Sequence, residues 1–331
     1  MQELKPDNIN AIDIIDSTLK YSKFNETALE IFKFQKTYSK YYAQWLKLLG
    51  SIDQDPQNIV DIPFIPISLF KQHKISCYSS HEIYFESSST TGKGVSRHYI
   101  HKKKIYDQTF ISTFNYFYKE KWDFVGALLP SYLDRNNSGL VYMVDTLIPL
   151  ISDSGDFFNK DYKSLVDIID NKREKNQKVL IFGVTFGLME LANISGNKNW
   201  DHITVIETGG MKGHGAEVVR DEVHNKLKST WNLNFIQSEY GMTELTSQAY
   251  SLNNGIFNCP PWMKVLIQDP SDPKSFLPIG KTGRICIIDL MNYHSCSFIA
   301  TDDLGKLNKD GSFEILGRID YSDIRGCNQL L

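Results

Sequence analysis

Strand-like apolar runs and helix-like segments alternate between residues 105 and 235, and this alternation constrains the fold more than any other feature. The apolar runs are 123-DFVGALLPSYL-133, 178-KVLIFGV-184 and 203-ITVIETGG-210, and helical stretches such as 105-IYDQTFISTFNYFYKEKW-122 and 186-FGLMELANI-194 lie between them. Short apolar runs that alternate with helices favour a sheet with helical crossovers. We therefore predict an α/β architecture.

The sequence before residue 76 predicts helices and then an extended segment. Apolar residues recur at helical intervals through 24-FNETALEIFKFQKTYSKYYAQWLKLLG-50, and Asn25 is suited to cap that helix. The two prolines of 61-DIPFIPISLFKQHKI-75 argue against a helix. We expect this second stretch to be an extended, structural segment packed on the surface of the main domain.

The last part of the chain has a different texture. Short strand-like runs, prolines and turn dipeptides fill residues 255–290, which indicates a smaller β-rich subdomain. Asp310-Gly311 lies between two strand-like runs and predicts a β-hairpin. We predict one domain over residues 1–331, made of a helical and extended start (1–75), an α/β core (76–254) and a β-rich subdomain with the C-terminal tail (255–331).

Composition excludes several classes of protein. The net charge of −3 gives no electrostatic reason to expect binding to nucleic acid or a membrane surface. No apolar run approaches the roughly 18 residues of a membrane span, and the polar start of the chain does not resemble a secretory signal. The cysteines are odd in number, 5, and scattered, as in cytosolic proteins with free thiols. We expect a cytoplasmic protein.

The segment 237-QSEYGMTEL-245 is the first candidate site. An aromatic ring at Tyr240 can cover a flat heterocycle, and Gly241 allows close approach of the backbone. Thr243 can donate to a phosphate oxygen, and the carboxylate of Glu244 can hold a hard cation such as Mg²⁺. Taken alone, the segment fits a strand that ends in an ordinary turn equally well.

Two glycine-containing loops add candidate phosphate sites. The loop 87-SSSTTGKG-94 offers backbone N–H groups, hydroxyls and the charge of Lys93, but Ser87 and Gly94 break the Walker pattern. The second loop lies in 208-TGGMKGHGAEVVRDEVHNKL-227, between a strand and the N-terminus of a helix, where anions commonly bind. A solvated loop and a tight structural turn are the competing interpretations.

These segments, followed by Asp303 and Arg318, occur in an order that resembles the acyl-adenylate-forming superfamily. Within it, the chain is most similar to the acyl-protein synthetases of bacterial fatty-acid reductase systems and is related to phenylacetate-CoA ligase. The resemblance covers most of the chain and includes residues 24–34, 61-DIPFIPISLFK-71, 129-LPSYLDRNNSGLVYMVD-145, 208-TGGMKGHG-215 and 323-DIRGC-327. It implies the large N-terminal domain of that fold.

The resemblance also implies the substrates and their contacts. ATP and Mg²⁺ are the expected cofactors, with Tyr240 on adenine, Thr243 on phosphate, Glu244 on the metal and Asp303 on the ribose hydroxyls. The full set of expected ATP or AMP contacts is Ser88, Ser89, Thr90, Thr91, Gly92, Gly94, Gly209, Gly210, Tyr240, Gly241, Met242, Thr243 and Asp303. Most relatives have Thr-Gly-Asp where this chain has 301-TDD-303, so Asp302 adds a negative charge beside the ribose contact.

The end of the chain departs from the superfamily. Most members continue past the hinge, here Asp320, into a mobile domain with a catalytic lysine, but only residues 321–331 follow. We expect that domain to be absent, so that cationic help must come from the chain's own side chains or from a partner. The candidates are Lys93, Lys212, Arg318 and Arg325, of which Lys93 and Arg318 are our catalytic predictions. The resembled synthetases hold the acyl group as a thioester on a cysteine near the C-terminus, and Cys327 matches that place.

The predicted function is therefore ATP-dependent activation of a carboxylic acid, of the fatty-acid class, followed by transfer to Cys327 for delivery to a partner. The relatives imply a reductase as acceptor, and an acyltransferase fits as well. An acyl-CoA or carrier-protein ligase and a non-catalytic binding subunit remain alternatives. The cysteines and histidine of 286-CIIDLMNYHSC-296 do not have zinc-site spacing, and no G-x-S-x-G or His-Glu-x-x-His hydrolase motif is present.

Overall fold

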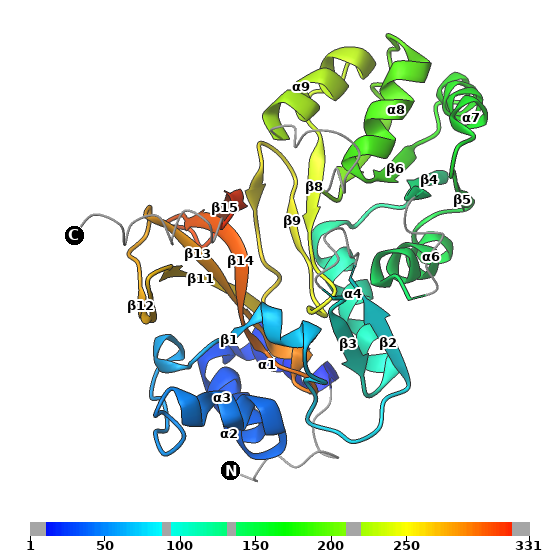
Figure 1. The fold of residues 1–331 in the computed structure, drawn as a ribbon. Helices are drawn as coiled ribbons and strands as arrows, with labels where there is room; N and C mark the ends of the chain where they lie inside the picture. Colours follow the sequence, from blue (N-terminus) through cyan, green and yellow to red (C-terminus); the bar gives the residue numbers. More distant parts are fainter. Residues whose placement is uncertain (1–10, 88–93, 131–136, 210–219, 320–331) are drawn as a thin grey trace. The chain divides into compact units, whose positions relative to one another are not determined.

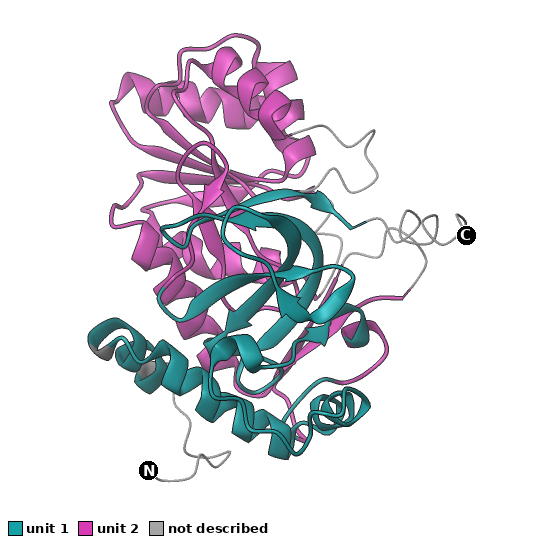
Figure 2. Ribbon diagram, turned by 90° about the vertical axis from the view of Figure 1, so that its left-hand side faces the viewer, with its two compact units in different colours: residues 1–69, 75–78, 261–331 teal, residues 70–74, 79–260 magenta. Residues whose placement is uncertain are grey.

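The computed structural model describes residues 11–87, 94–130, 137–209 and 220–319 (Figure 1). The chain divides into two compact units (Figure 2). Unit 1 combines residues 1–69, 75–78 and 261–331, and unit 2 combines residues 70–74 and 79–260. Both ends of the sequence therefore belong to unit 1.

Unit 2 is built on a six-stranded, mainly parallel sheet with the order β5-β4-β6-β7-β8-β9. Its strands are β4 (Phe124–Leu128), β5 (Gly155–Phe157), β6 (Val179–Gly183), β7 (Ile203–Glu207), β8 (Gln237–Tyr240) and β9 (Ala249–Ser251). The short β10 (Ile256–Phe257) follows β9 in the sequence and is not part of this sheet. The helices are α4 (Lys103–Phe117), α6 (Gly139–Ile151), α7 (Tyr162–Glu174), α8 (Thr185–Ser195) and α9 (Arg220–Trp231). Only β9 runs antiparallel to its neighbour.

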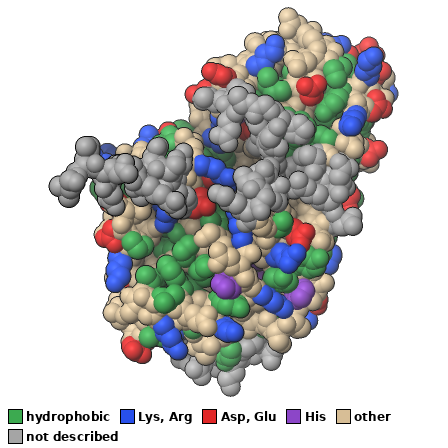
Figure 3. Space-filling view, viewed as in Figure 1, with side chains coloured by type: hydrophobic (Ala, Val, Ile, Leu, Met, Phe, Trp, Pro, Cys, Tyr) green, Lys and Arg blue, Asp and Glu red, His purple; other side chains and the backbone are tan. Residues whose placement is uncertain are grey.

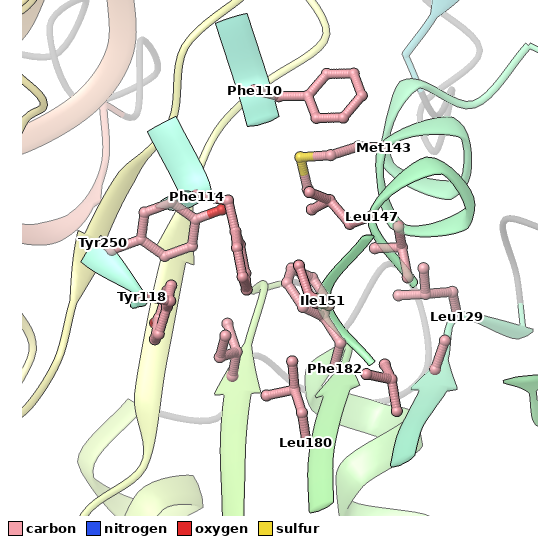
Figure 4. Packing of buried hydrophobic residues seen from close by; sticks show 14 of the residues in the cluster. Phe110, Phe114, Tyr118, Leu129, Met143, Leu147, Ile151, Leu180, Phe182 and Tyr250 are labelled. Carbon is pink, nitrogen blue, oxygen red and sulfur yellow. The ribbon is translucent and has the colours of Figure 1, made fainter. Parts of the chain in front are cut away.

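Helices cover both faces of this sheet, as the side chains of its central strand β6 show. All five of its residues are buried, and alternate side chains enter different clusters. Leu180 and Phe182 pack with α4 and α6 in the cluster drawn in Figure 4. Val179 and Ile181 pack with α7, α8 and α9 on the other face. The predicted α/β architecture is confirmed.

A separate hairpin in unit 2 leads into and out of the loop that begins at Ser87. Strands β2 (Ile83–Glu86) and β3 (Arg97–Ile100) pair antiparallel, with Phe85 opposite His98. Phe85 and Ile100 belong to the same buried cluster as α4 and α6. One face of the hairpin therefore packs against the same buried cluster as α4 and α6.

Unit 1 combines three N-terminal helices with an antiparallel sheet. The helices are α1 (Ala11–Tyr21), α2 (Phe24–Tyr38) and α3 (Lys40–Leu48). The sheet contains β11 (Met263–Asp269), β12 (Asp272–Phe276), β13 (Thr282–Asp289), β14 (Phe298–Leu307) and β15 (Phe313–Arg318), and β1 (Ile65–Pro66) adds to β14 in parallel. Gln35 of α2 is fully buried and donates to the carbonyls of Asn292, in the 3₁₀ helix η4 (Leu290–Asn292), and Tyr293 at 3.2 and 3.0 Å.

Most of the predicted local structure is confirmed, with two differences. Asn25 does not cap α2, because the helix begins at Phe24 and Lys23 is at the N-cap position. Helices occupy residues 24–48 with a break at Ser39, and the Asp310-Gly311 turn joins β14 to β15. The stretch 61–75 was expected to be extended, but it contains only the two-residue β1, between the 3₁₀ helices η2 (Ile59–Asp61) and η3 (Ile67–Lys71). It is also not a surface segment throughout, because Phe64, Ile65 and Phe70 are buried.

Candidate active site

The carboxyl end of β7 carries the start of the predicted glycine loop. In open α/β sheets, ligands commonly bind at this edge. Gly209 has φ of +60°, a left-handed conformation that a glycine adopts without strain. The Gly209 N–H donates to Oε1 of Glu207 at 3.1 Å. The conformation at the start of this loop is therefore held by a side chain from the strand itself.

Glu207 is a buried carboxylate that the sequence analysis did not identify. Its side chain accepts from Thr185 Oγ1 at 2.5 Å and from Ser238 Oγ at 3.4 Å, and His224 Nε2 lies 3.5 Å from Oε2. Burial raises the pKa of Glu207, but the hydrogen bonds from His224 and Thr185 and the charge of Arg220 outweigh burial and lower the pKa overall. Glu207 is therefore ionised at neutral pH.

Ser238, His224 and Glu207 do not form a hydrolase triad. In such a triad, one imidazole nitrogen faces the serine and the other faces the acid. Here the same nitrogen, Nε2 of His224, lies 3.5 Å from both Ser238 Oγ and Glu207 Oε2. Ser238 is also buried. The three residues thus form a structural network beside Gly209.

The last two residues of β8, Glu239 and Tyr240, pack closely against their neighbours. The ring of Tyr240 meets Phe257 edge-on, with 6.0 Å between ring centroids, and the Arg220 guanidinium lies 5.0 Å from the Phe257 ring. The preceding carboxylate, Glu239, accepts from Thr208 Oγ1 at 2.8 Å, which joins the ends of β7 and β8. A Cβ atom at Gly241 would overlap Glu239 Oε1, so only glycine fits there without a shift.

Thr243 and Glu244 lie in a turn directly after this glycine. The Leu245 N–H closes the turn by donating to the carbonyl of Met242 at 3.1 Å. Nδ1 of His98, from strand β3, lies 2.8 Å from the carbonyl oxygen of Thr243. Glu244 is 5% exposed. The hairpin that leads into the loop at 87–94 and the Thr-Glu turn are therefore in direct contact within unit 2.

Glu244 fits the expected magnesium ion as one of few protein ligands. Among the described residues, no group of three or more His, Cys, Asp or Glu side chains forms a preassembled metal site. Mg²⁺ beside a nucleotide usually takes one or two carboxylates, and phosphate oxygens and waters complete the shell. A single carboxylate in the Thr-Glu turn agrees with that kind of site.

Asp303 and Arg318 are brought together in unit 1. They are register partners on β14 and β15, and Arg318 Nε lies 3.4 Å from Asp303 Oδ1. The Arg318 side chain is 78% exposed, and that of Asp303 is 14% exposed. An ion pair with so exposed an arginine adds little stability.

Several predicted site residues lie outside the described residues, and their roles stay predictions. They are Ser88, Ser89, Thr90, Thr91, Gly92, Lys93, Gly210 and Cys327, together with the alternative cations Lys212 and Arg325. Gly94 is described, and its φ of +89° again requires the freedom of a glycine.

Solved structures identify the fold as that of acyl-adenylate-forming ligases. ATP-bound MatB from Rhodopseudomonas palustris matches with a TM-score of 0.55 and 18% identity, over 71% of this chain and 47% of that chain. The chain thus spans about half the length of MatB. An open conformation of 2-hydroxyisobutyryl-CoA ligase matches with a TM-score of 0.68 and 14% identity, over 89% of this chain and 74% of that chain. The predicted fold is confirmed.

Sequence comparison narrows this class to one family. The model of the LuxE acyl-protein synthetase family matches residues 138–331, more than half of the chain, so the chain belongs to that family. A long-chain-fatty-acid–luciferin-component ligase from Aliivibrio fischeri is 22% identical over 305 residues, which cover 83% of this chain and 79% of the relative. The expected membership in a ligase family is thereby confirmed.

Acidic and basic side chains are interspersed on the face shown in Figure 3, without a broad basic area among the residues described there. No helix in the described part of the chain is both long and apolar enough to span a bilayer.

Proposed function

We propose that this chain, as a single acyl-adenylate-forming domain, activates a fatty acid with ATP and Mg²⁺ and then carries the acyl group on Cys327. The observation that supports this most directly is the geometry after β8. Tyr240 ends β8, Gly241 follows it, and Thr243 and Glu244 lie in the next turn. The hydrogen bond from Thr208 to Glu239 joins the end of β8 to the end of β7. The Aliivibrio relative, named for a long-chain fatty acid, supports the class of acid.

In the first step, an oxygen of the substrate carboxylate attacks the α-phosphorus of ATP. A new P–O bond forms, the bond to the β-phosphate bridge breaks, and pyrophosphate leaves. Tyr240 stacks on adenine, Thr243 donates to a phosphate oxygen, and Glu244 holds the Mg²⁺, which neutralises phosphate charge. Asp303 accepts from the ribose hydroxyls, and Arg318 and Lys93 supply positive charge to the phosphates.

In the second step, a cysteine thiolate attacks the carbonyl carbon of the acyl-AMP. The C–S bond forms, the C–O bond to AMP breaks, and AMP leaves with the electron pair. The thiol must lose its proton before the attack, because the thiolate is the nucleophile. The acyl group is then delivered to a partner, a reductase in the relatives' systems, or an acyltransferase.

Burial of three described cysteines limits which thiols can accept the acyl group. Burial raises the pKa of Cys77 and Cys286 well above the ordinary thiol value, and it raises the pKa of Cys296 to about 12. These three thiols carry almost no thiolate at neutral pH. Cys259 is partly exposed, so Cys259 and Cys327 are the two thiols to compare.

The test is covalent labelling by a radioactive fatty acid in the presence of ATP and Mg²⁺. The wild-type protein should form a hydroxylamine-sensitive bond, Cys327→Ser should abolish it, and the matched Cys259→Ser should retain it. Carboxylate-dependent exchange of pyrophosphate into ATP should survive in both variants. Full labelling of Cys327→Ser would refute the role of this residue.

The same assays separate the alternatives. A CoA ligase would release AMP only when CoA is present and would be indifferent to Cys327→Ser. A non-catalytic binding subunit would show no pyrophosphate exchange in any variant. Intact-mass measurement with a panel of carboxylic acids then reports which acid becomes attached and how many acyl groups each chain carries.

A further inference from the structure

His98 is a histidine on the apolar face of the β2–β3 hairpin. Side chains alternate along a strand, so His98 shares its face with Ile100 and with its register partner Phe85. All three are buried, and His98 is fully buried. Phe70 meets the imidazole edge-on at 6.1 Å between ring centroids. A polar ring at such a position needs a hydrogen-bond partner, because an unsatisfied buried polar group is costly.

One partner of His98 comes from the candidate active site. Its Nδ1 lies 2.8 Å from the carbonyl oxygen of Thr243, 145 positions further along the chain. A carbonyl oxygen only accepts hydrogen bonds, so Nδ1 carries a proton and donates. The contacted carbonyl precedes Glu244, so the bond fixes the backbone that presents the predicted metal ligand.

The hairpin on which His98 lies is held together up to the point where the loop departs. The Ser87 N–H donates to the Ser96 carbonyl at 3.0 Å, and the Ser96 N–H donates back to Ser87 Oγ at 2.9 Å. The Glu86 N–H donates to the Asn137 carbonyl at 2.9 Å. His98, two residues after Ser96, therefore belongs to an ordered stem.

We propose that His98 is a positioning residue that holds the stem of the 87–94 loop in register with the Thr243–Glu244 turn. The inference rests on the proposed function, which assigns a phosphate contact to Thr243 and a metal contact to Glu244. His98 itself does not touch the reacting atoms. Its hydrogen bond holds the backbone of Thr243 and Glu244 against strand β3, so its loss should weaken the binding of ATP and leave the binding of the acid unchanged.

Three variants separate the effect of losing the hydrogen-bond donor from the effect of losing the volume of the ring. His98→Leu removes the donor and replaces the imidazole with an apolar side chain of similar size. His98→Asn retains an amide N–H where Nδ1 stands, whereas His98→Gln moves the amide to the position of Nε2. The matched control is His101→Leu, because His101 Nδ1 also contacts a carbonyl, that of Ser80 at 3.0 Å, at the exposed end of the same hairpin.

In pyrophosphate exchange, His98→Leu should raise the KM for ATP by about tenfold, the factor that corresponds to one buried hydrogen bond. The KM for the fatty acid should stay within about twofold, by the same argument. His98→Asn should recover most of the affinity, and His101→Leu should match the wild type. An unchanged KM for ATP in folded His98→Leu, or an Asn variant as impaired as Leu, would overturn the proposal.

Hydrogen exchange of the ligand-free protein tests the same contact without catalysis. His98→Leu should lose amide protection in both 83–100 and 241–247, whereas His101→Leu should keep it in the second segment. If His98→Leu does not fold, His98→Gln takes its place against His98→Asn. Absence of pyrophosphate exchange in the wild type would refute the proposed function alone, and equal protection in all variants would refute the role of His98.

Discussion

Replacing Glu207 by Gln tests whether the buried network around this carboxylate stabilises unit 2 through its charge. Gln has nearly the same shape and retains one acceptor oxygen, so the change creates no cavity. It removes the negative charge that accepts from Thr185, Gly209 and Ser238. It also places the amide N–H₂ group of Gln, which only donates, where one carboxylate oxygen of Glu207 accepted.

The magnitude follows from the number of donors. A hydrogen bond to a charged group contributes about 1.5–3 kcal/mol, and one to a neutral group about 0.5–1.5 kcal/mol. Three donors that each lose about 1 kcal/mol give a loss of about 3 kcal/mol in the free energy of unfolding. That loss corresponds to a fall in Tm of about 6–12 °C.

The effect should depend on pH with a defined sign. The pKa of Glu207 in the folded protein lies below its ordinary value of 4.5. The stabilisation from its charge is therefore complete well above pH 4.5 and is lost as the pH falls through the folded-state pKa. The difference between wild type and Glu207→Gln should be largest at neutral pH and should shrink below pH 4.5.

Denaturant unfolding from pH 3 to pH 8, followed by circular dichroism, measures this difference. The control is Glu222→Gln, which removes the same charge from an exposed position on α9 and should leave stability within about 0.5 kcal/mol. Equal stability of Glu207→Gln and wild type at pH 7, or a difference that grows toward acid, would refute the argument.

Two further predictions concern Tyr240, at the end of β8, and Gly241, which follows it. Gly241→Ala should destabilise the protein by about 1–3 kcal/mol and depress pyrophosphate exchange, because its Cβ overlaps the Glu239 carboxylate that Thr208 holds. Gly139→Ala, whose nearest contact is 3.2 Å, should be much milder in the same unfolding and exchange assays. Tyr240→Ala should raise the KM for ATP by about 5- to 150-fold, the value of one base–aromatic stack, whereas Tyr240→Phe should leave it nearly unchanged.

The sequence predicted the parts of the fold that depend on neighbouring residues. The apolar run at β6, the helical spacing of α2 and the Asp310-Gly311 turn are local signals, and each is found where it was expected. The pairing of β1 with β14 is different, because it joins Ile65 to Ile299. The two prolines in 61–75 correctly argued against an α-helix, but local pattern alone did not reveal the 3₁₀ helices on either side of this short strand.

The residues of the candidate site likewise divide into those that have a local sequence signal and those that have none. Tyr240, Gly241, Thr243 and Glu244 stand together in the sequence, and their residue types already indicate contacts to a base, a phosphate and a cation. Glu207 gave no such signal, because a Glu at the end of an apolar run is ordinarily an exposed residue.

His98 and Glu239 show why the supporting residues escape a reading of the sequence. Each is a buried polar residue on a strand, and its partner lies far along the chain, at Thr243 and Thr208 respectively. Burial of such groups is tolerated only when the fold supplies the partner. A polar residue that a strand buries beside a site motif is therefore the one whose partner should be sought. In this chain it leads from the Thr-Glu turn, through His98, to the stem of the predicted phosphate loop.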